Sequence, residues 1–461
     1  MHKNKLTYNK LFSKDYFLLW QGQFVSRIGS QIYLIAMIIW IKDSTDSAGL
    51  LGLMGFIGGL PALIFAIIGG TFADRHSRKN IIIASDVING LLMLILAYLL
   101  YVHASSINVI IYFLMFSTIL TSIVGSFFSP AISAAIPDIV GKDNLTMANS
   151  WSQGSQQIVT ILGLGLGGIL YVAIGVPLLV LLNGVSFMFS AFSEMFITIP
   201  QVIPEKAKTI KEQFNNFIID IKSGFKYIWE RTGLRNLVLT SVLTNFFSVP
   251  IALLLPFYID SVLHVNESWL GYLLAIGAIG SIFGYVFSGL FKLNQNVRLI
   301  LIFSFIFIDG IFYVLLGTFS SLFITIGIMF FSGIVNGFVI VHIQTILQLT
   351  IESNHRGRIF GFIGTISGAL IPLSMGLFGY LADLTNKNIS IIYTFSGFSI
   401  VLVSLFIIKN KDIKSFLQSN ELIIEEDSNK YERNQIGLMN EVKLNNKAME
   451  QIKGKFKSNK K

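Results

Sequence analysis

The sequence predicts an all-α membrane protein with twelve transmembrane helices in two pseudo-symmetric six-helix bundles. Of its 461 residues, 53% are hydrophobic and only 13% are charged, whereas a soluble domain has roughly 25% charged residues. The apolar residues form long runs, each close to the ~20 residues that a helix needs to cross a bilayer. The basic residues collect in the loops on one side, which is typical of membrane proteins.

Twelve apolar runs are expected to span the membrane as helices, because a helix satisfies its backbone hydrogen bonds within one segment. In the first half they are Tyr16–Ile41, Leu50–Ala73, Ile81–Tyr101, Ile107–Ser129, Gln156–Ile174 and Pro177–Ile199. In the second half they are Leu237–Ile259, Trp269–Phe291, Val297–Thr318, Leu322–Ile346, Ile359–Leu381 and Ile389–Ile408. Barrel strands would be shorter, about ten residues, and would alternate in polarity.

The distribution of Lys and Arg predicts how the chain crosses the membrane. One set of loops holds most of the basic residues, among them Arg75, Arg78 and Lys79, whereas the opposite set holds only Lys42 and Lys387. Basic loops stay in the cytoplasm. We therefore expect a multi-pass protein of a bacterial-type plasma membrane with both termini in the cytoplasm. The net charge of +9 then belongs to membrane loops, and nucleic acid is not an expected partner.

The longest internal loop divides the chain. We expect an N-terminal bundle over residues 1–200, a cytoplasmic linker over 201–235, a C-terminal bundle over 236–408 and a polar cytoplasmic tail over 409–461. Between Phe214 and Ile228 apolar residues recur at helical spacing, which is typical of an amphipathic helix on a membrane surface. A solvated linker helix fits the same pattern. A weak repeat relates the two halves, as in many transporters.

A charged motif joins the second and third spans. Gly70, Asp74, Arg75, Arg78 and Lys79 match the pattern Gly-x-x-x-Asp-Arg-x-Gly-Arg-Lys, in which Ser77 replaces the second glycine. On these residues the sequence resembles the major facilitator superfamily. The segments 20–26 in span one and 129–131 at the end of span four resemble its branch of macrolide efflux proteins and an enterobactin exporter. The resemblance runs from about residue 12 to residue 408.

The resemblance implies alternating access, in which two bundles rock against each other. The motif would hold the cytoplasmic side closed in one state, with Asp74 meeting helix amides or a guanidinium of the other half. Spans two, five, eight and eleven would form the moving interface, where glycines such as Gly280 and Gly284 would serve as sliding contacts. Spans one, four, seven and ten would line the substrate cavity with Gln23, Arg27, Gln31, Thr121, Asn245 and Asn336.

Ionisable residues inside spans are functional candidates, because a charge at the centre of a membrane helix costs roughly 2.5–3.5 kcal/mol on insertion scales. Asp309 lies near mid-depth in span nine and is a candidate for coupling to protons. Asp86 and Glu194 are further coupling candidates. They are expected about one turn inside the cytoplasmic end, where Asp86 could pair with Arg75 or Arg78.

Arg27 is expected to face the cavity. It lies four residues from Gln23 and four from Gln31, so the three share one helical face. The first six spans are expected to hold no acid at the depth of Arg27, which leaves it without a partner in its own bundle. A wet cavity tolerates such a guanidinium, whose forked donors would bind an anionic or carbonyl-rich ligand and disfavour cations.

The predicted function is the export of an amphipathic small molecule, such as a macrolide-like drug, in exchange for protons. The sequence has no Gly-x-x-x-x-Gly-Lys-Ser/Thr loop, so ATP is not the expected driver, and no cysteine for a thiolate metal site. We expect a monomer in the bilayer without cofactor, metal or enzymatic activity. Two alternatives stay open: an exporter of a siderophore, metabolite or lysolipid, and a non-transporting receptor or assembly partner.

Overall fold

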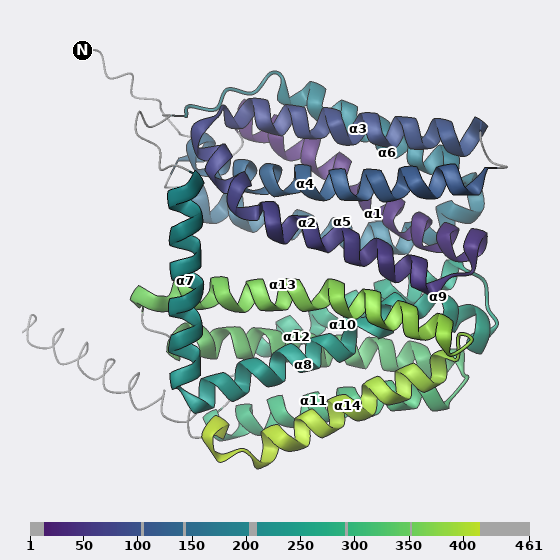
Figure 1. Ribbon diagram of the computed structural model, residues 1–461, viewed down its shortest axis with the longest axis vertical. Coiled ribbons are helices and arrows are strands. Elements are labelled where there is room, and N and C mark those ends of the chain that lie inside the picture. Colours follow the sequence, from purple (N-terminus) through teal and green to yellow (C-terminus); the bar gives the residue numbers. More distant parts are fainter. Residues whose placement is uncertain are drawn as a thin grey trace, which may run out of the picture.

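The computed structural model describes residues 13–102, 106–141, 144–201, 210–290, 294–350 and 353–414, and within these ranges all regular structure is helical. Figure 1 shows two stacks of long helices, α1–α6 in one and α8–α14 in the other, with α7 lying across one end of both. We call this end the α7 end and the other the opposite end.

The N-terminal bundle consists of six long helices. These are α1 (Lys14–Thr45), α2 (Ala48–Arg75), α3 (Arg78–Val102), α4 (Ile107–Val140), α5 (Leu145–Ile174) and α6 (Val176–Glu194). Helix α1 packs against α5 and α6, α3 packs against α4 and α6, and α2 packs against α4. The expected end of span four at Ser129 is wrong, because α4 continues through Pro130 and Pro137 to Val140. Packed neighbours allow a membrane helix to keep its course past a proline.

The C-terminal bundle has the same number of long helices and one break. Its elements are α8 (Thr232–Leu253), α9 (Leu255–Tyr258), a π-helical turn (Ile259–Leu263), α10 (Ser268–Leu290), α11 (Gln295–Thr318), α12 (Leu322–Thr350), α13 (Ser353–Leu384) and α14 (Ile389–Lys409). The seventh span, expected as one helix, is interrupted at Leu254. Pro256 in the first turn of α9 explains the break, since it lacks the N–H that would bond to the carbonyl of Ala252 in a continuous helix.

The helices have the lengths and compositions that the twelve-span prediction requires. Eleven of the described helices are long and apolar enough to cross a membrane. The twelfth span corresponds to α13, whose segment Gly368–Leu384 is apolar. The expected all-α membrane fold is confirmed.

The two bundles meet where α2 packs against α13 and α5 packs against α10. These are spans two, eleven, five and eight, so the interface implied by the resemblance is confirmed. The expected role of two glycines is wrong: Gly280 and Gly284 face α12 of their own bundle. Gly52 of α2 lies at the real interface, because a Cβ there would be 2.3 Å from the carbonyl oxygen of Met375 in α13. Only glycine permits that approach of two backbones.

Helix α7 (Ile210–Glu230) forms within the linker segment, where the sequence predicts an amphipathic helix. It contacts α13 and α8 of the C-terminal bundle and α2 of the N-terminal bundle. Figure 1 shows it roughly perpendicular to the long helices. It therefore links the ends of both bundles. Most of the polar tail, residues 415–461, lies outside the described residues.

Candidate functional site

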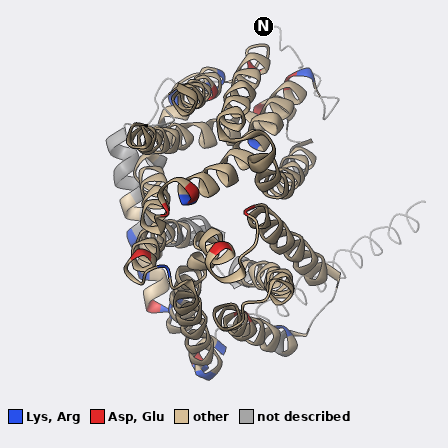
Figure 2. Cartoon of the chain, turned by 90° about the vertical axis from the view of Figure 1, so that its right-hand side faces the viewer, with Lys and Arg blue, Asp and Glu red and all other residues tan. Residues whose placement is uncertain are grey.

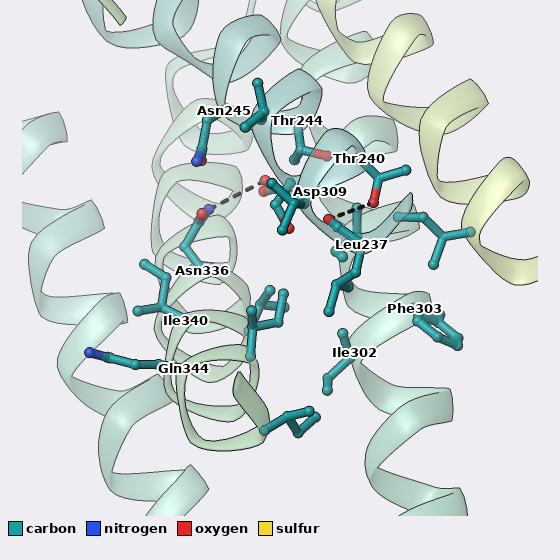
Figure 3. Close-up of a pocket in the computed structure, with 18 of the residues that line it drawn as sticks. Leu237, Thr240, Thr244, Asn245, Ile302, Phe303, Asp309, Asn336, Ile340 and Gln344 are labelled. Atoms are coloured by element: carbon teal, nitrogen blue, oxygen red, sulfur yellow. Dashed lines mark hydrogen bonds between the residues drawn. The ribbon is translucent and has the colours of Figure 1, made fainter. Parts of the chain in front are cut away.

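A cavity of about 320 Å³ lies within the C-terminal bundle, between α8, α11 and α12 (Figure 3). Apolar side chains form most of its wall, among them Leu237, Ile302 and Phe303. Its polar groups are sparse, and they are mainly hydroxyls and amides: Thr240, Ser241, Thr244, Asn245, Asn336, Gln344 and one acid, Asp309. Figure 3 shows Asn245 and Asn336 pointing toward each other from α8 and α12. Two residues that the sequence assigns to the cavity, Asn245 and Asn336, therefore do line one.

Asp309 is the acid of this cavity, and its side chain is held by neutral donors. It is 4% exposed. Its Oδ1 accepts from the hydroxyl of Ser332 at 2.5 Å, and its Oδ2 accepts from the amide of Asn336 at 3.3 Å. Tyr313, one turn along α11, lies close enough to interact with it. No cationic side chain among the described residues forms an ion pair with Asp309. This environment suits a carboxyl group that gains and loses a proton.

A second cluster of buried acids lies in the N-terminal bundle. Asp86 of α3 is 2% exposed and Glu194 of α6 is 0% exposed. Gln23 of α1 donates to Oε1 of Glu194 at 2.7 Å and to Oδ2 of Asp86 at 3.5 Å. The two carboxyl groups therefore lie next to each other and interact directly.

The expectation that Asp86 pairs with Arg78 of the basic loop is wrong. Asp86 and Glu194 lie on the inner faces of α3 and α6, which pack directly against each other. Arg78, one of the two expected partners of Asp86, instead forms an ion pair with Asp138 of α4. The distance along a span estimates the depth of a residue, but it does not show which face the neighbouring helix covers.

Arg27 lines a cavity of about 30 Å³ between α1, α4 and α5, together with Tyr16, Trp20, Gln23 and Gln156. Its side chain is partly buried, and Asp86 lies near enough to attract it electrostatically. The expectation that its own bundle holds no acid to neutralise it is therefore wrong. Within the described residues Arg27 has no ion pair within 4.0 Å, so its guanidinium keeps donors for a ligand or water.

Two further residues assigned to the cavity line neither of these two cavities. Gln31 packs against α5 at Gly163, where a Cβ would lie 2.2 Å from the Cβ of Gln31. Thr121 of α4 is half-buried, and its hydroxyl has no hydrogen-bond partner among the described residues. The six residues expected in one cavity are thus divided among different places in the structure.

The charged motif forms the tight connection between α2, which ends at Arg75, and α3, which begins at Arg78. Arg78 pairs with Asp138 and also donates to the carbonyl of Ala134 at 3.2 Å. Lys79 donates to the carbonyl of Met195 at 2.7 Å. These contacts all lie within the N-terminal bundle.

The gating role of the motif stays a prediction. The side chain of Asp74 lies outside the described part of the structure, as do those of Arg356 and Arg358 at the facing end of α13. Around Gly70 there is open space, since a Cβ would meet no described atom within 4 Å.

At the opposite end, polar contacts that the sequence did not predict join the bundles. Asp383 of α13 accepts from the backbone N–H groups of Ala48 and Gly49 at 2.9 and 2.8 Å, and from the hydroxyl of Ser47 at 2.8 Å. The carboxylate thus meets the positive N-terminus of α2. Ion pairs Lys42–Asp260, at 2.9 Å, and Lys387–Asp46 also cross between the halves. Figure 2, which looks onto this end, shows red and blue segments where the two bundles adjoin.

Known proteins are similar to this chain in sequence, and others are similar to it in fold. The family model described as Major Facilitator Superfamily matches residues 19–374. The chain belongs to the Major Facilitator Superfamily. Macrolide efflux protein A of Streptococcus pyogenes is 26% identical over 392 residues, which cover 81% of this chain and 90% of that protein. Multidrug efflux pump Tap of Mycolicibacterium fortuitum is 22% identical over 366 residues, covering 77% of this chain and 86% of that protein.

Solved structures of the superfamily have the same fold. The nucleoside transporter NupG aligns with a TM-score of 0.66 at 13% identity, over 86% of this chain and 99% of that one. An inward-facing bacterial homologue of the iron transporter ferroportin aligns with a TM-score of 0.66 at 15% identity, over 86% and 98%. The protein is therefore a superfamily transporter, similar in sequence to the macrolide efflux branch.

Proposed function

We propose that the protein exports an amphipathic, macrolide-like small molecule by alternating access and that protons entering the cell drive the export. The observation that carries the proposal is the apolar cavity of about 320 Å³ with the buried Asp309 in its wall. Among the described residues, no cationic side chain forms an ion pair with this acid. Similarity to macrolide and multidrug efflux proteins over most of their length supports the same direction of transport.

The cavity suits an amphipathic compound. Its volume is at the lower end of the ~300–1,000 Å³ that hold drug-sized ligands. Apolar walls take up hydrophobic surface, and a few amides and hydroxyls orient the ligand through its oxygens. The amides of Asn245 and Asn336 are the expected ligand contacts from the C-terminal bundle. Arg27 is the expected contact from the N-terminal bundle, where it favours anionic or carbonyl groups.

Asp309 is the proposed coupling residue. A carboxyl with only neutral donors around it can exist in both protonation states without breaking an ion pair. Asn336 lines the cavity and donates to Asp309, so a ligand that binds this amide would change the environment of the acid. This shared residue links ligand binding to proton binding.

The conformation is proposed to be inward-facing, with both termini and the α7 end in the cytoplasm. The two halves, residues 1–200 and 236–408, would be the moving bodies, joined by the linker 201–235 and followed by the tail 409–461. At the opposite end they are fastened together by Asp383 and by two ion pairs. The motif from Gly70 to Lys79 would close the α7 end in the alternate state.

The test is transport by inside-out membrane vesicles with an imposed pH gradient. Macrolides, lipophilic dyes and siderophores are offered in turn to vesicles with and without the protein. We expect accumulation of at least one amphipathic compound that collapses when an ionophore dissipates the gradient. Accumulation that persists after this treatment would contradict proton coupling, and failure with every compound would contradict the substrate class.

A further inference from the structure

The Asp86–Glu194 pair is a buried acid cluster that the proposed coupling through Asp309 leaves unused. Its two carboxyl groups are almost fully buried, and both bind the amide of Gln23, which brings them next to each other. Two ionised carboxylates that share one amide donor would repel each other strongly in a protein interior, where charges are poorly screened. One proton on either carboxyl group removes the repulsion, and the protonated group can then donate a hydrogen bond to the other.

The hydrogen bonds around Glu194 indicate which oxygen carries the proton. Its Oε1 accepts from the amide of Gln23 at 2.7 Å, and the hydroxyl of Ser190 lies 3.5 Å away. Its Oε2 is buried and has no donor among the described residues. Buried polar atoms are rarely left without a partner. A proton on Oε2, donated to the carboxylate of Asp86, satisfies this atom.

The charges around the pair keep the proton on Glu194 rather than on Asp86. Helix α1 contributes Arg27, which attracts the carboxylate of Asp86 on α3. The other neighbours of Glu194, which are Gln23 of α1 and Ser190 of α6, are neutral. Within the described residues, no cation forms an ion pair with Glu194.

We propose that Glu194 is a second proton-binding site of this protein, which holds one proton on Oε2 and donates it in a hydrogen bond to Asp86. The proton can leave in two steps. The O–H bond of Glu194 breaks as one forms on Asp86, which then transfers the proton to water. The cavity of about 30 Å³ that Gln23 and Arg27 line is large enough for a water, which needs ~10–15 Å³, and Gln23 connects it to Asp86, to which its amide donates at 3.5 Å.

The place of this proton in transport rests on the proposed function. If the protein exchanges its ligand for protons, each bundle has one proton-binding residue. It is Asp309 in the C-terminal half and Glu194 in the N-terminal half. Release of the proton adds a second negative charge beside Asp86, the carboxylate that attracts Arg27, and so strengthens the attraction that draws its guanidinium away from a ligand. Protonation and ligand binding at Arg27 would therefore favour each other.

Infrared difference spectroscopy of the full-length protein in liposomes tests the site through the C=O stretch of protonated carboxyl groups during a pH titration. We expect Glu194→Gln to remove the intensity of one buried carboxylic acid. Asp86→Asn should keep that band at the acidic end of the titration and move it to higher frequency, because the acid loses a charged acceptor. Glu230→Gln, at an exposed position of α7, is the matched control and should leave the band unchanged.

Two outcomes would overturn the proposal. In one, Glu194→Gln leaves every protonated-carboxyl band in place. In the other, Asp86→Asn removes the band at every pH of the titration, the acidic end included, which would put the proton on Asp86. The titration needs no transported compound, so a failure here is separate from a failure of the export assay. Asp309→Asn should remove a different band and leave that of Glu194 unchanged.

Discussion

Asp309 differs from a surface acid in that the protein replaces its water shell with side chains. Ser332 and Asn336 are hydrogen-bonded to it, and Tyr313 lies close by. Ser332 and Asn336 lie four residues apart on α12, so one helical face supplies two of the partners. Burial disfavours the ionised form, whereas the donors favour it. The balance between these effects allows a small change in the surroundings, such as a ligand on Asn336, to move the proton.

Asp309→Asn should abolish export driven by a pH gradient, because the amide cannot exchange a proton. Its oxygen can still accept from Ser332, and its new NH2 group can donate to Asn336 once that amide turns over. Exchange of labelled for unlabelled ligand without a gradient should continue, since the cavity keeps its shape. The measurement compares both activities in vesicles at equal protein level. Asp412→Asn, at an exposed position, is the control. Normal gradient-driven export by Asp309→Asn would assign the coupling proton to another residue.

Arg27→Gln should change ligand preference. The guanidinium lines the smaller cavity beside Gln23, and its charge should favour anionic over cationic ligands. With matched anionic and cationic dyes, we expect wild type to prefer the anionic one. In the variant this preference should fall about tenfold, which corresponds to a loss of ~1.4 kcal/mol in the binding free energy of the anionic dye relative to the cationic one. If the ratio of anionic to cationic dye export is the same in both proteins, Arg27 does not contact the ligand.

At the scale of elements, α2 is the helix on which both proposed closures act. Its first residues bind Asp383 of α13 at the opposite end. Its last residues belong to the charged motif at the α7 end. Between them, Gly52 allows its backbone to touch α13. A tilt of α2 against α13 would therefore open one end as it closes the other.

Asp383→Ala should loosen the opposite end. The substitution removes an acceptor from two N–H groups and one hydroxyl, and the loss of a helix cap costs about 0.5–2 kcal/mol. A cysteine at Met375, which packs on Gly55 across the interface, should then react faster with a membrane-impermeant maleimide. Asp43→Ala is the matched control, because Asp43 pairs at the same end with Lys42 and Tyr171 of its own bundle. Equal labelling rates in wild type and Asp383→Ala would show that this contact does not hold the end closed.

Asp74→Asn should impair export more than it impairs the amount of protein in the membrane. The carboxylate is proposed to be needed in the state with a closed α7 end, so its loss should slow the cycle without unfolding the bundle. Export rate per molecule, from vesicles with quantified protein, is the relevant measurement. Wild-type rates would reduce Asp74 to an ordinary surface acid.

For the molecule as a whole, the sequence predicts the course of the chain much better than it predicts the sites. Runs such as Leu322–Ile346 stand out because a bilayer requires about 20 apolar residues in a row. The structure begins that helix at the same residue and ends it at Thr350. The linker helix is equally visible, because its apolar residues recur with the helical period.

The sites depend on contacts between helices, which no single stretch of sequence contains. Asp86 and Glu194 lie 108 positions apart and meet because α3 packs on α6. Ser332 and Asn336 form a visible polar stripe, but their acceptor, Asp309, comes from another helix. Asp383 follows the apolar part of span eleven and looks like an ordinary loop acid until α2 is placed beside it.

The central claim, that ligand leaves in exchange for protons, is tested most directly by following both in one preparation. Purified protein is reconstituted in liposomes that enclose a pH indicator, and a transported ligand identified in the vesicle assay is loaded inside without any initial pH gradient. We expect ligand efflux to acidify the lumen, and we expect an imposed pH gradient to speed that efflux. Ligand efflux at the same rate with no change in internal pH would contradict proton exchange.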